Sequence, residues 1–176
     1  MANYIKGNLI NVFYSYMDSS VATPEWKFFA YTQSSGLSIS NSLNSISSKS
    51  HGLHSDKILN ESTWEMSNSA YGTIEDLNNG VAMAQSGKEY SFCFCKVNDG
   101  NDDVANTGLS GVTTIGDTST FIPGTQFVKY GNAIVSAASI SSNTGDMSSI
   151  DITLTGLGGL ADTAPTGDRL KSFVKV

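Results

Sequence analysis

The chain has 176 residues, of which 39% are hydrophobic and 15% charged, and it carries a net charge of -6 at pH 7. At this length we expect one domain, which buries on the order of 70% of its unfolded surface and needs no disulfide or metal to fold. The acidic balance and scattered basic residues argue against tight nucleic-acid binding, and no apolar run approaches the roughly 20 residues of a membrane-spanning helix.

Ser, Asn, Thr and Gly take the place of charged residues in this composition. Such a surface favours association between copies, because little electrostatic repulsion keeps them apart. The first residues lack the charged start and apolar centre of a signal peptide. We therefore expect a cytosolic protein in which the two cysteines, Cys93 and Cys95, are free thiols.

The N-terminal quarter of the chain predicts β-strands. Residues 4–16 are dense in β-branched and aromatic side chains, which favour a strand. After a turn, an aromatic run at 26–31 and an alternating pattern at 37–40 predict a strand pair or one long strand.

Residues 40–62 are rich in Ser, Asn, Lys and His and show neither a helical nor a strand period. This pattern predicts a long loop, and loops of this length are usually functional or disordered. The segment keeps enough apolar residues to become ordered on a partner. The contact residues predicted in it are Leu43, Ile46, Leu53, Ile58 and Leu59.

The next two predicted elements are a strand and a helix. Residues 63–69 alternate apolar and polar side chains, as a half-buried strand does. Thr73 is a good N-cap, Asp76 stands three residues further on, and Gly87 supplies a C-terminal stop. Because apolar residues recur between them at helical spacing, one helix is predicted over about 73–86.

A strand is predicted at 89–97, with Tyr90, Phe92 and Phe94 on one face and Ser91, Cys93 and Cys95 on the other. Residues 98–119 are rich in Gly, Asp, Asn and Thr, and they predict a connection with a short strand near 112–115.

The last third predicts a hairpin and a tail. Residues 127–140 and 149–155 form the two strands, and the stretch between them carries the turn residues Asn and Gly. The fold class that follows is mainly β, a β-sandwich or barrel with one packed helix. Residues 162–176 read as a polar tail, and its apolar side chains are expected to dock on a neighbour: Leu170, Phe173, Val174 and Val176.

Catalytic and metal sites find little support. The two histidines, His51 and His54, both lie in the 40–62 segment, and no serine or cysteine stands in a nucleophile motif. With Cys93 and Cys95 they offer four ligands of the type that zinc prefers, but the Cys-x-Cys spacing is unusual. We favour free thiols and loop histidines over a zinc site.

Residues 99–103 are similar to the opening of a calcium loop. Val104 and Ser110 stand where that loop needs glycine and glutamate, so we favour a solvated turn. No phosphate-binding glycine loop is present, and Glu75 and Asp76 are explained as charges that complement a helix start. We therefore expect no enzyme activity, no catalytic residue, no metal and no cofactor.

The order of elements resembles the tail tube proteins of long-tailed bacteriophages, whose fold is shared with contractile injection systems and the haemolysin-coregulated protein. Residues 6–13, Lys-Gly-Asn-Leu-Ile-Asn-Val-Phe, are similar to the opening of that family. Residues 131–140 and 149–158 are similar to its closing hairpin, which ends in Thr-Gly-x-Gly. The resemblance covers 1–161 as one domain and leaves 162–176 as a C-terminal tail.

The resemblance implies a structural subunit whose hexameric rings stack into a hollow tube that conducts DNA during genome ejection. The loop from Ser42 to Glu61 would contact the next ring. Expected partners are further copies of the chain, tail initiator, terminator and tape-measure proteins, a sheath in contractile tails, and DNA in passage, with no membrane. The expected location is the virion tail, assembled in the host cytoplasm. The lumen candidates are Asp151, Thr153 and Thr155.

The alternative is a β-sandwich carbohydrate-binding or adhesin module. Such a module presents exposed aromatic side chains on one platform. Trp26 and Trp64 lie instead within strand patterns that bury aromatic residues, so both are predicted to pack in the core.

Overall fold

The computed structural model describes residues 10–18, 24–28, 31–46, 56–71, 74–96, 128–142 and 148–175. Its elements in chain order are β1 (Ile10–Asp18), β2 (Glu25–Phe28), β3 (Tyr31–Ile46), β4 (Asp56–Tyr71), α1 (Ile74–Ser86), β5 (Glu89–Lys96), β6 (Val128–Ser141), β7 (Ser149–Ala161), a 3-10 turn (Gly167–Arg169) and β8 (Phe173–Lys175). The prediction of a mainly-β fold with one helix near 73–86 is confirmed.

The described strands form one eight-stranded sheet in the order β2-β1-β5-β6-β7-β4-β3. All pairs on this path are antiparallel, and β8 pairs with β1 in parallel. A closed barrel or a sandwich of two sheets is therefore not what these strands build. The sheet curls instead, and Ser35 of β3 donates a hydrogen bond of 2.9 Å from its Oγ to the carbonyl oxygen of Ile10 in β1.

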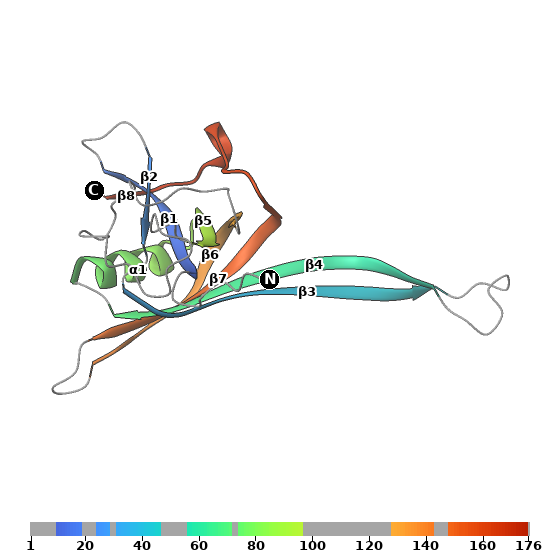
Figure 1. The fold of residues 1–176 in the computed structure, drawn as a ribbon, viewed down its shortest axis with the longest axis horizontal. Helices are drawn as coiled ribbons and strands as arrows, with labels where there is room; N and C mark the ends of the chain where they lie inside the picture. Colours follow the sequence, from blue (N-terminus) through green and yellow to red (C-terminus); the bar gives the residue numbers. More distant parts are fainter. Residues whose placement is uncertain are drawn as a thin grey trace, which may run out of the picture.

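The main core lies between α1 and the sheet. Met83 of α1 is fully buried in it, and strand residues such as Tyr14, Phe92 and Leu154 complete the cluster. The opposite face of β1, β5 and β6 carries a second buried cluster around Phe13. Figure 1 shows α1 against the sheet, with the C-terminal segment beside β1 and β2.

Strand β5 has the two faces expected from its alternation, and both are buried. Tyr90, Phe92 and Phe94 belong to the main core, whereas Cys93 and Cys95 belong to the second cluster. Strands β6 and β7 confirm the closing hairpin, which continues to Ala161. The short strand expected near 112–115 lies outside the described residues.

The expected loop over 40–62 is wrong for the described part of that segment. Residues 40–46 continue β3, and residues 56–62 belong to β4. The two strands pair from Ser40 opposite Thr63 to Ile46 opposite Asp56, with a register shift between Ser42 and Leu43. A bulge of this kind moves side chains to the other face, which hides the strand period in the sequence.

The N-terminal strands also lie apart from each other. β2, at the aromatic run near 26–31, pairs with β1 at one edge of the sheet, whereas β3 pairs with β4 at the other edge. They are therefore two strands with different partners, not one long strand.

The C-terminal segment returns to its own chain. Phe173 is buried against Tyr14, Tyr16 and Tyr90, with ring centroids 5.9 to 6.5 Å away. The expectation that Phe173 docks on a neighbour is therefore wrong, because the side chain fills the core of the same protomer. Val174 is exposed, Leu170 is half-buried, and Val176 lies outside the described residues.

Candidate functional site

One face of β7 is buried and the other is polar. Ile150, Ile152 and Leu154 lie in the main core. Asp151 and Thr155, on the other face, are exposed, and Thr153 is half-buried. This alternation is what a sheet with one covered face requires. The three lumen candidates therefore share one accessible face of the protomer.

The polar face extends over four strands, because residues directly opposite each other in neighbouring strands share a face. The rows across β4, β7 and β6 are Ser69, Asp151 and Ser139; Ser67, Thr153 and Ala137; and Glu65, Thr155 and Ile134. Strand β3 adds Ser34, Gly36 and Ser38 to these rows. Apart from Ile134, the rows hold hydroxyl groups, small side chains and two carboxylates, and none of their members is a lysine or an arginine.

Beyond this face, β3 and β4 project as a two-stranded hairpin that we call the arm, residues 39–46 and 56–64. β4 pairs with β7 only from Glu65 to Tyr71, so the arm strands pair with each other alone among the described strands. At roughly 3.3 Å per residue, nine residues reach about 30 Å. Figure 1 shows the arm leaving the body of the protomer.

The arm exposes large apolar side chains that the body of the protomer does not cover. Five of them have 42 to 56% of their surface exposed: Ile39, Leu43, Ile46, Ile58 and Leu59. Four of these are the contact residues predicted from the sequence, and the fifth predicted residue, Leu53, lies outside the described residues. Ile39 is the member that sequence reasoning missed, although it stands in a strand pattern next to the predicted loop.

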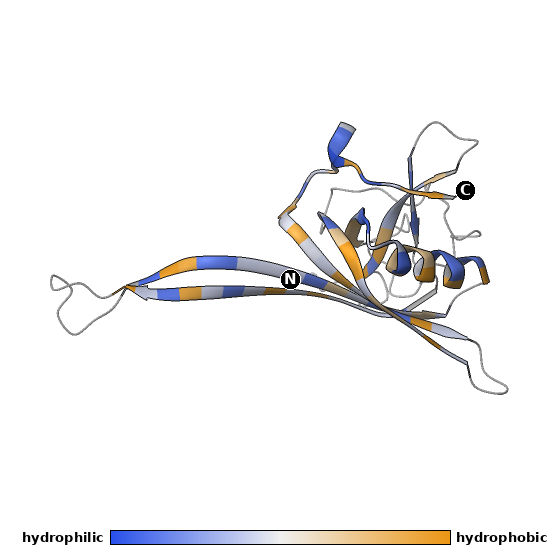
Figure 2. Ribbon diagram, turned by 180° about the vertical axis from the view of Figure 1, so that it is seen from behind, coloured by the Kyte–Doolittle hydropathy of each residue, from blue (hydrophilic) through white to orange (hydrophobic). Residues whose placement is uncertain are grey.

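The exposed apolar residues of the arm lie on both of its faces. Ile39 lies opposite Trp64, and Leu43 lies opposite Leu59 on the same face, with the polar pair of Asn41 and Ser62 between them. We call the exposed residues Ile39, Leu43 and Leu59 the apolar stripe, which this polar pair interrupts. The other face carries polar pairs that extend the polar face of the body, namely Ser38 with Glu65, Ser40 with Thr63, and Ser42 with Glu61. Toward the tip this face ends in Ile58 and Ile46. Figure 2 shows the resulting bands of hydropathy along the arm.

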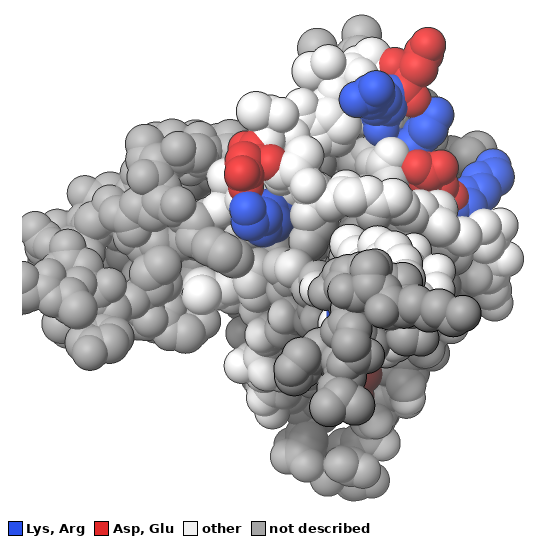
Figure 3. Space-filling view, turned by 90° about the vertical axis from the view of Figure 1, so that its right-hand side faces the viewer, with Lys and Arg blue, Asp and Glu red and all other residues white. Residues whose placement is uncertain are grey.

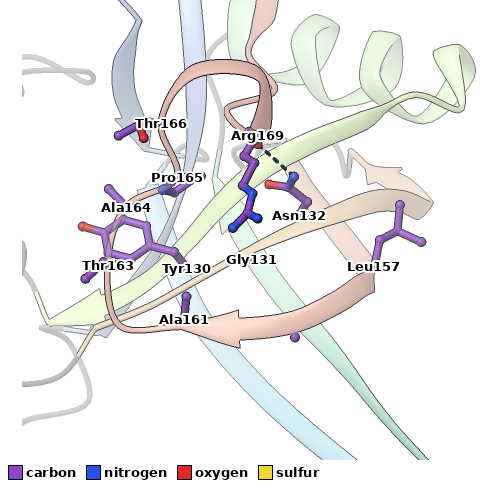
Figure 4. Close-up of a pocket in the computed structure, with 11 residues that line it drawn as sticks. Tyr130, Gly131, Asn132, Leu157, Ala161, Thr163, Ala164, Pro165, Thr166 and Arg169 are labelled. Carbon is purple, nitrogen blue, oxygen red and sulfur yellow. Dashed lines mark hydrogen bonds between the residues drawn. The ribbon is translucent and has the colours of Figure 1, made fainter.

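A hollow of about 330 Å³ lies at the far end of β6 and β7, beneath the segment that leads to the 3-10 turn. Its wall is closed by Asn132, whose amide donates hydrogen bonds to the Arg169 carbonyl at 3.0 Å and to Glu89 at 2.8 Å. Figure 4 shows Arg169 and Tyr130 among the lining side chains. The lining holds no pair of carboxyl or imidazole groups that could serve as acid and base.

Cys93 and Cys95 are buried thiols in the second cluster. Burial raises the pKa of Cys93 far above its usual range, and the neighbouring Cys95 raises it further. Burial also raises the pKa of Tyr130, which lies beside these cysteines. Such groups stay uncharged at neutral pH, and a neutral thiol is neither a nucleophile nor a metal ligand.

Metal ligands are not gathered in the part of the chain that the structure describes, where no three His, Cys, Asp or Glu side chains lie together. His51, His54 and residues 99–103, which entered the zinc and calcium alternatives, lie outside that part. Within the same described ranges, no helix is long and apolar enough to cross a membrane.

The tryptophans form no exposed platform. Trp64 is buried with 3% of its surface exposed. Trp26 is half-buried, and its ring centroid lies 5.5 Å from that of Tyr130. The prediction of core packing is confirmed for Trp64. On the face drawn in Figure 3, basic and acidic side chains lie beside each other. Lys129 and Asp162 form one such ion pair in the structure.

No family model and no curated protein matches the sequence. Solved structures do match the fold. The tail of an empty gene transfer agent (GTA) particle, refined with helical and C6 symmetry, aligns with a TM-score of 0.60 and 12% identity, over 92% of this chain and 100% of that chain. The virion of a native GTA particle aligns with a TM-score of 0.54 and 10% identity over the same shares.

The SPP1 tail tube, solved by solid-state NMR and cryo-electron microscopy, aligns with a TM-score of 0.56 and 14% identity. The alignment covers 88% of this chain and 77% of that chain. The chain therefore has the fold that is found in tail tubes, as the resemblance in its sequence predicted.

Proposed function

We propose that this chain is the structural subunit of a viral tail tube, in which hexameric rings stack into a hollow cylinder. The arm carries the proposal, because it projects from the protomer with large apolar side chains that the protomer leaves exposed. An apolar patch of this kind on a soluble protein marks an interaction surface. The fold shared with the GTA and SPP1 tails supports another copy of the chain as the occupant.

The geometry of the arm favours an open assembly. Its contact residues lie along an arm that reaches about 30 Å from the body at the strand rise. The surface of one copy that they contact is therefore different from the surface of the copy to which they belong. Such head-to-tail contacts close into a ring around one axis and continue without limit along it. A tube requires both kinds of contact, because subunits must close into rings and the rings must stack along the axis.

The polar face is proposed to line the channel. Its hydroxyl groups and the carboxylates of Glu65 and Asp151 offer phosphates no cationic partner. Because protein binding to DNA depends on neutralising phosphates with lysine and arginine, such a wall lets DNA pass without holding it. Genome passage is therefore the proposed role of Asp151, Thr153 and Thr155.

A tube of defined length needs further proteins at its ends and inside it. We expect initiator, terminator and tape-measure proteins as partners, and a sheath where the tail contracts. The proposed location is the virion tail, reached after assembly in the host cytoplasm. Residues 162–176 are proposed as a C-terminal addition to the tube domain that spans residues 1–161.

The test replaces the apolar stripe and observes assembly by electron microscopy. Leu43→Asn with Leu59→Asn is expected to abolish tubes across a concentration series, because the stripe would lose its apolar contact. Both side chains are exposed in the protomer, so its free energy of unfolding should change by less than about 0.5 kcal/mol.

The matched control lies on the opposite face of the same arm. Ser42→Asn with Glu61→Gln changes a neighbouring pair there and is expected to leave tubes intact. Tubes formed by the Leu43→Asn, Leu59→Asn protein would show that the arm does not make the contact between copies. If the unaltered chain stays monomeric even with a tail initiator present, the proposed function itself is contradicted.

A further inference from the structure

Trp64 occupies an unusual position where the arm joins the body. It is the buried residue at the base of the arm, and it lies immediately before Glu65, where the pairing of β4 with β7 begins. Its indole N–H donates a hydrogen bond of 2.8 Å to the carbonyl oxygen of Gly158 in β7. The side chain therefore ties the base of the arm to the closing strand.

Two glycines make room for the indole. A Cβ at Gly156 of β7 would lie 2.1 Å from Trp64 Cε2, and a Cβ at Gly131 of β6 would lie 2.4 Å from Trp64 Cζ2. Real Cβ atoms do not approach so closely, so only glycine fits at either position. One side chain from β4 thus lies across β7 and reaches β6.

The strand geometry also aims the acceptor at the indole. Leu157 lies opposite Asn132 and Ala161 opposite Tyr130, so β7 carries three residues where β6 carries one. Within this bulge Gly158 has a φ of 75°, in the left-handed region that favours glycine. Bulges re-aim backbone groups in this way. The Thr-Gly-x-Gly stretch that closes the hairpin is therefore a socket for Trp64.

We propose that the Trp64 socket is the joint that holds the arm in the orientation needed for assembly. Beyond Trp64 no described strand other than the partner hairpin strand supports the arm. With the indole in place, the base of the arm contacts both β7 and β6. Without it, the arm base loses its side-chain contacts with β6 and β7, and its remaining supports, such as the β4–β7 hydrogen bonds and buried Met66, lie further from the arm. The role in assembly rests on the proposed function, whereas the mechanical role does not.

The arm orientation can be measured with spin labels. Cysteines introduced at Asn44 on the arm and Ser139 on the body are both exposed, and the two native thiols are buried, so labelling is selective. We expect a narrow distance distribution in the unaltered chain. Gly156→Ala and Trp64→Leu should each broaden it, because the first displaces the indole and the second removes it. Gly159→Ala is the matched control, since its Cβ meets nothing within 4 Å.

Assembly provides the second readout. If the competent orientation falls to a tenth of the population, the critical concentration for tubes rises about tenfold. Trp64→Phe, which keeps the ring but not the N–H, should lie between the unaltered chain and Trp64→Leu. The effect of Gly156→Ala should disappear in the Trp64→Leu background, because the two residues form one contact.

The possible outcomes separate the two proposals. Unchanged distance distributions in folded Gly156→Ala and Trp64→Leu would overturn the joint, whether or not tubes form. Broadened distributions together with an unchanged critical concentration would overturn its role in assembly. Broadening in a chain that never forms tubes, even without substitution, would support the joint while contradicting the proposed function.

Discussion

Phe173 allows a sharp test of how the C-terminal segment is attached. The segment is held by β8 pairing with β1, by the Ser91 N–H that donates to the Lys171 carbonyl at 2.7 Å, and by the hydrogen bond between Ser15 and Ser172 at 2.6 Å. Phe173 adds the single buried aromatic ring, with 9% of its surface exposed. The perturbation is Phe173→Ala.

The expected loss follows from the burial and the ring contacts. Phe→Ala in a core costs about 3 to 5 kcal/mol. The edge-to-face contacts with Tyr14 and Tyr90 belong to that loss. Because a three-residue strand can detach from β1 once its ring is gone, we expect the lower limit, about 3 kcal/mol. In a domain of this size that lowers the melting temperature by roughly 6 to 12 °C.

The assay is urea and thermal unfolding of the unassembled protein, at a concentration too low for tubes. Val174→Ala is the control, because its side chain is 43% exposed and the same strand pairing remains. We expect that control to change stability by less than about 0.5 kcal/mol. Equal stability of both variants would refute the reasoning, and a Phe173→Ala protein that is stable but unable to assemble would place the ring in a neighbouring copy.

Two further predictions concern the buried thiol and the polar face. Because burial raises the folded-state pKa of Cys93, the folded protein keeps a proton that the unfolded chain releases. The free energy of unfolding should therefore stay level below about pH 8.5 and fall by up to about 1.4 kcal/mol per pH unit above it. Urea unfolding between pH 7 and 10 should show this slope and its reduction in Cys93→Ala, whereas a flat profile would contradict it. Asp151→Lys should leave tubes intact but make them retain labelled double-stranded DNA at low salt, with retention lost at high salt; the absence of retention would argue against Asp151 in the channel wall.

Some features of this protein could be read from the sequence because they are local. The helix at Ile74–Ser86 has its stop residue and its apolar spacing within a few turns. Strand β5 and the hairpin of β6 and β7 show their alternation directly, since successive side chains of a strand point to opposite faces. The division of β7 into a buried and a polar face follows from the same alternation.

Other features depended on contacts between distant segments. The arm was not recognised because Asn60 is an extra residue in β4, opposite the step from Ser42 to Leu43, and interrupts the strand period there. The order of strands in the sheet was not evident either, because backbone hydrogen bonds are the same for all strands and so the sequence does not show which strands pair. Trp64 meets Gly131 and Gly156 only in the folded sheet, and Phe173 reaches Tyr14 from the far end of the chain. The sequence by itself determined the helix, strand β5 and the β6–β7 hairpin with their apolar faces, because their patterns are local, whereas only the tertiary structure decided which faces meet and which stay open.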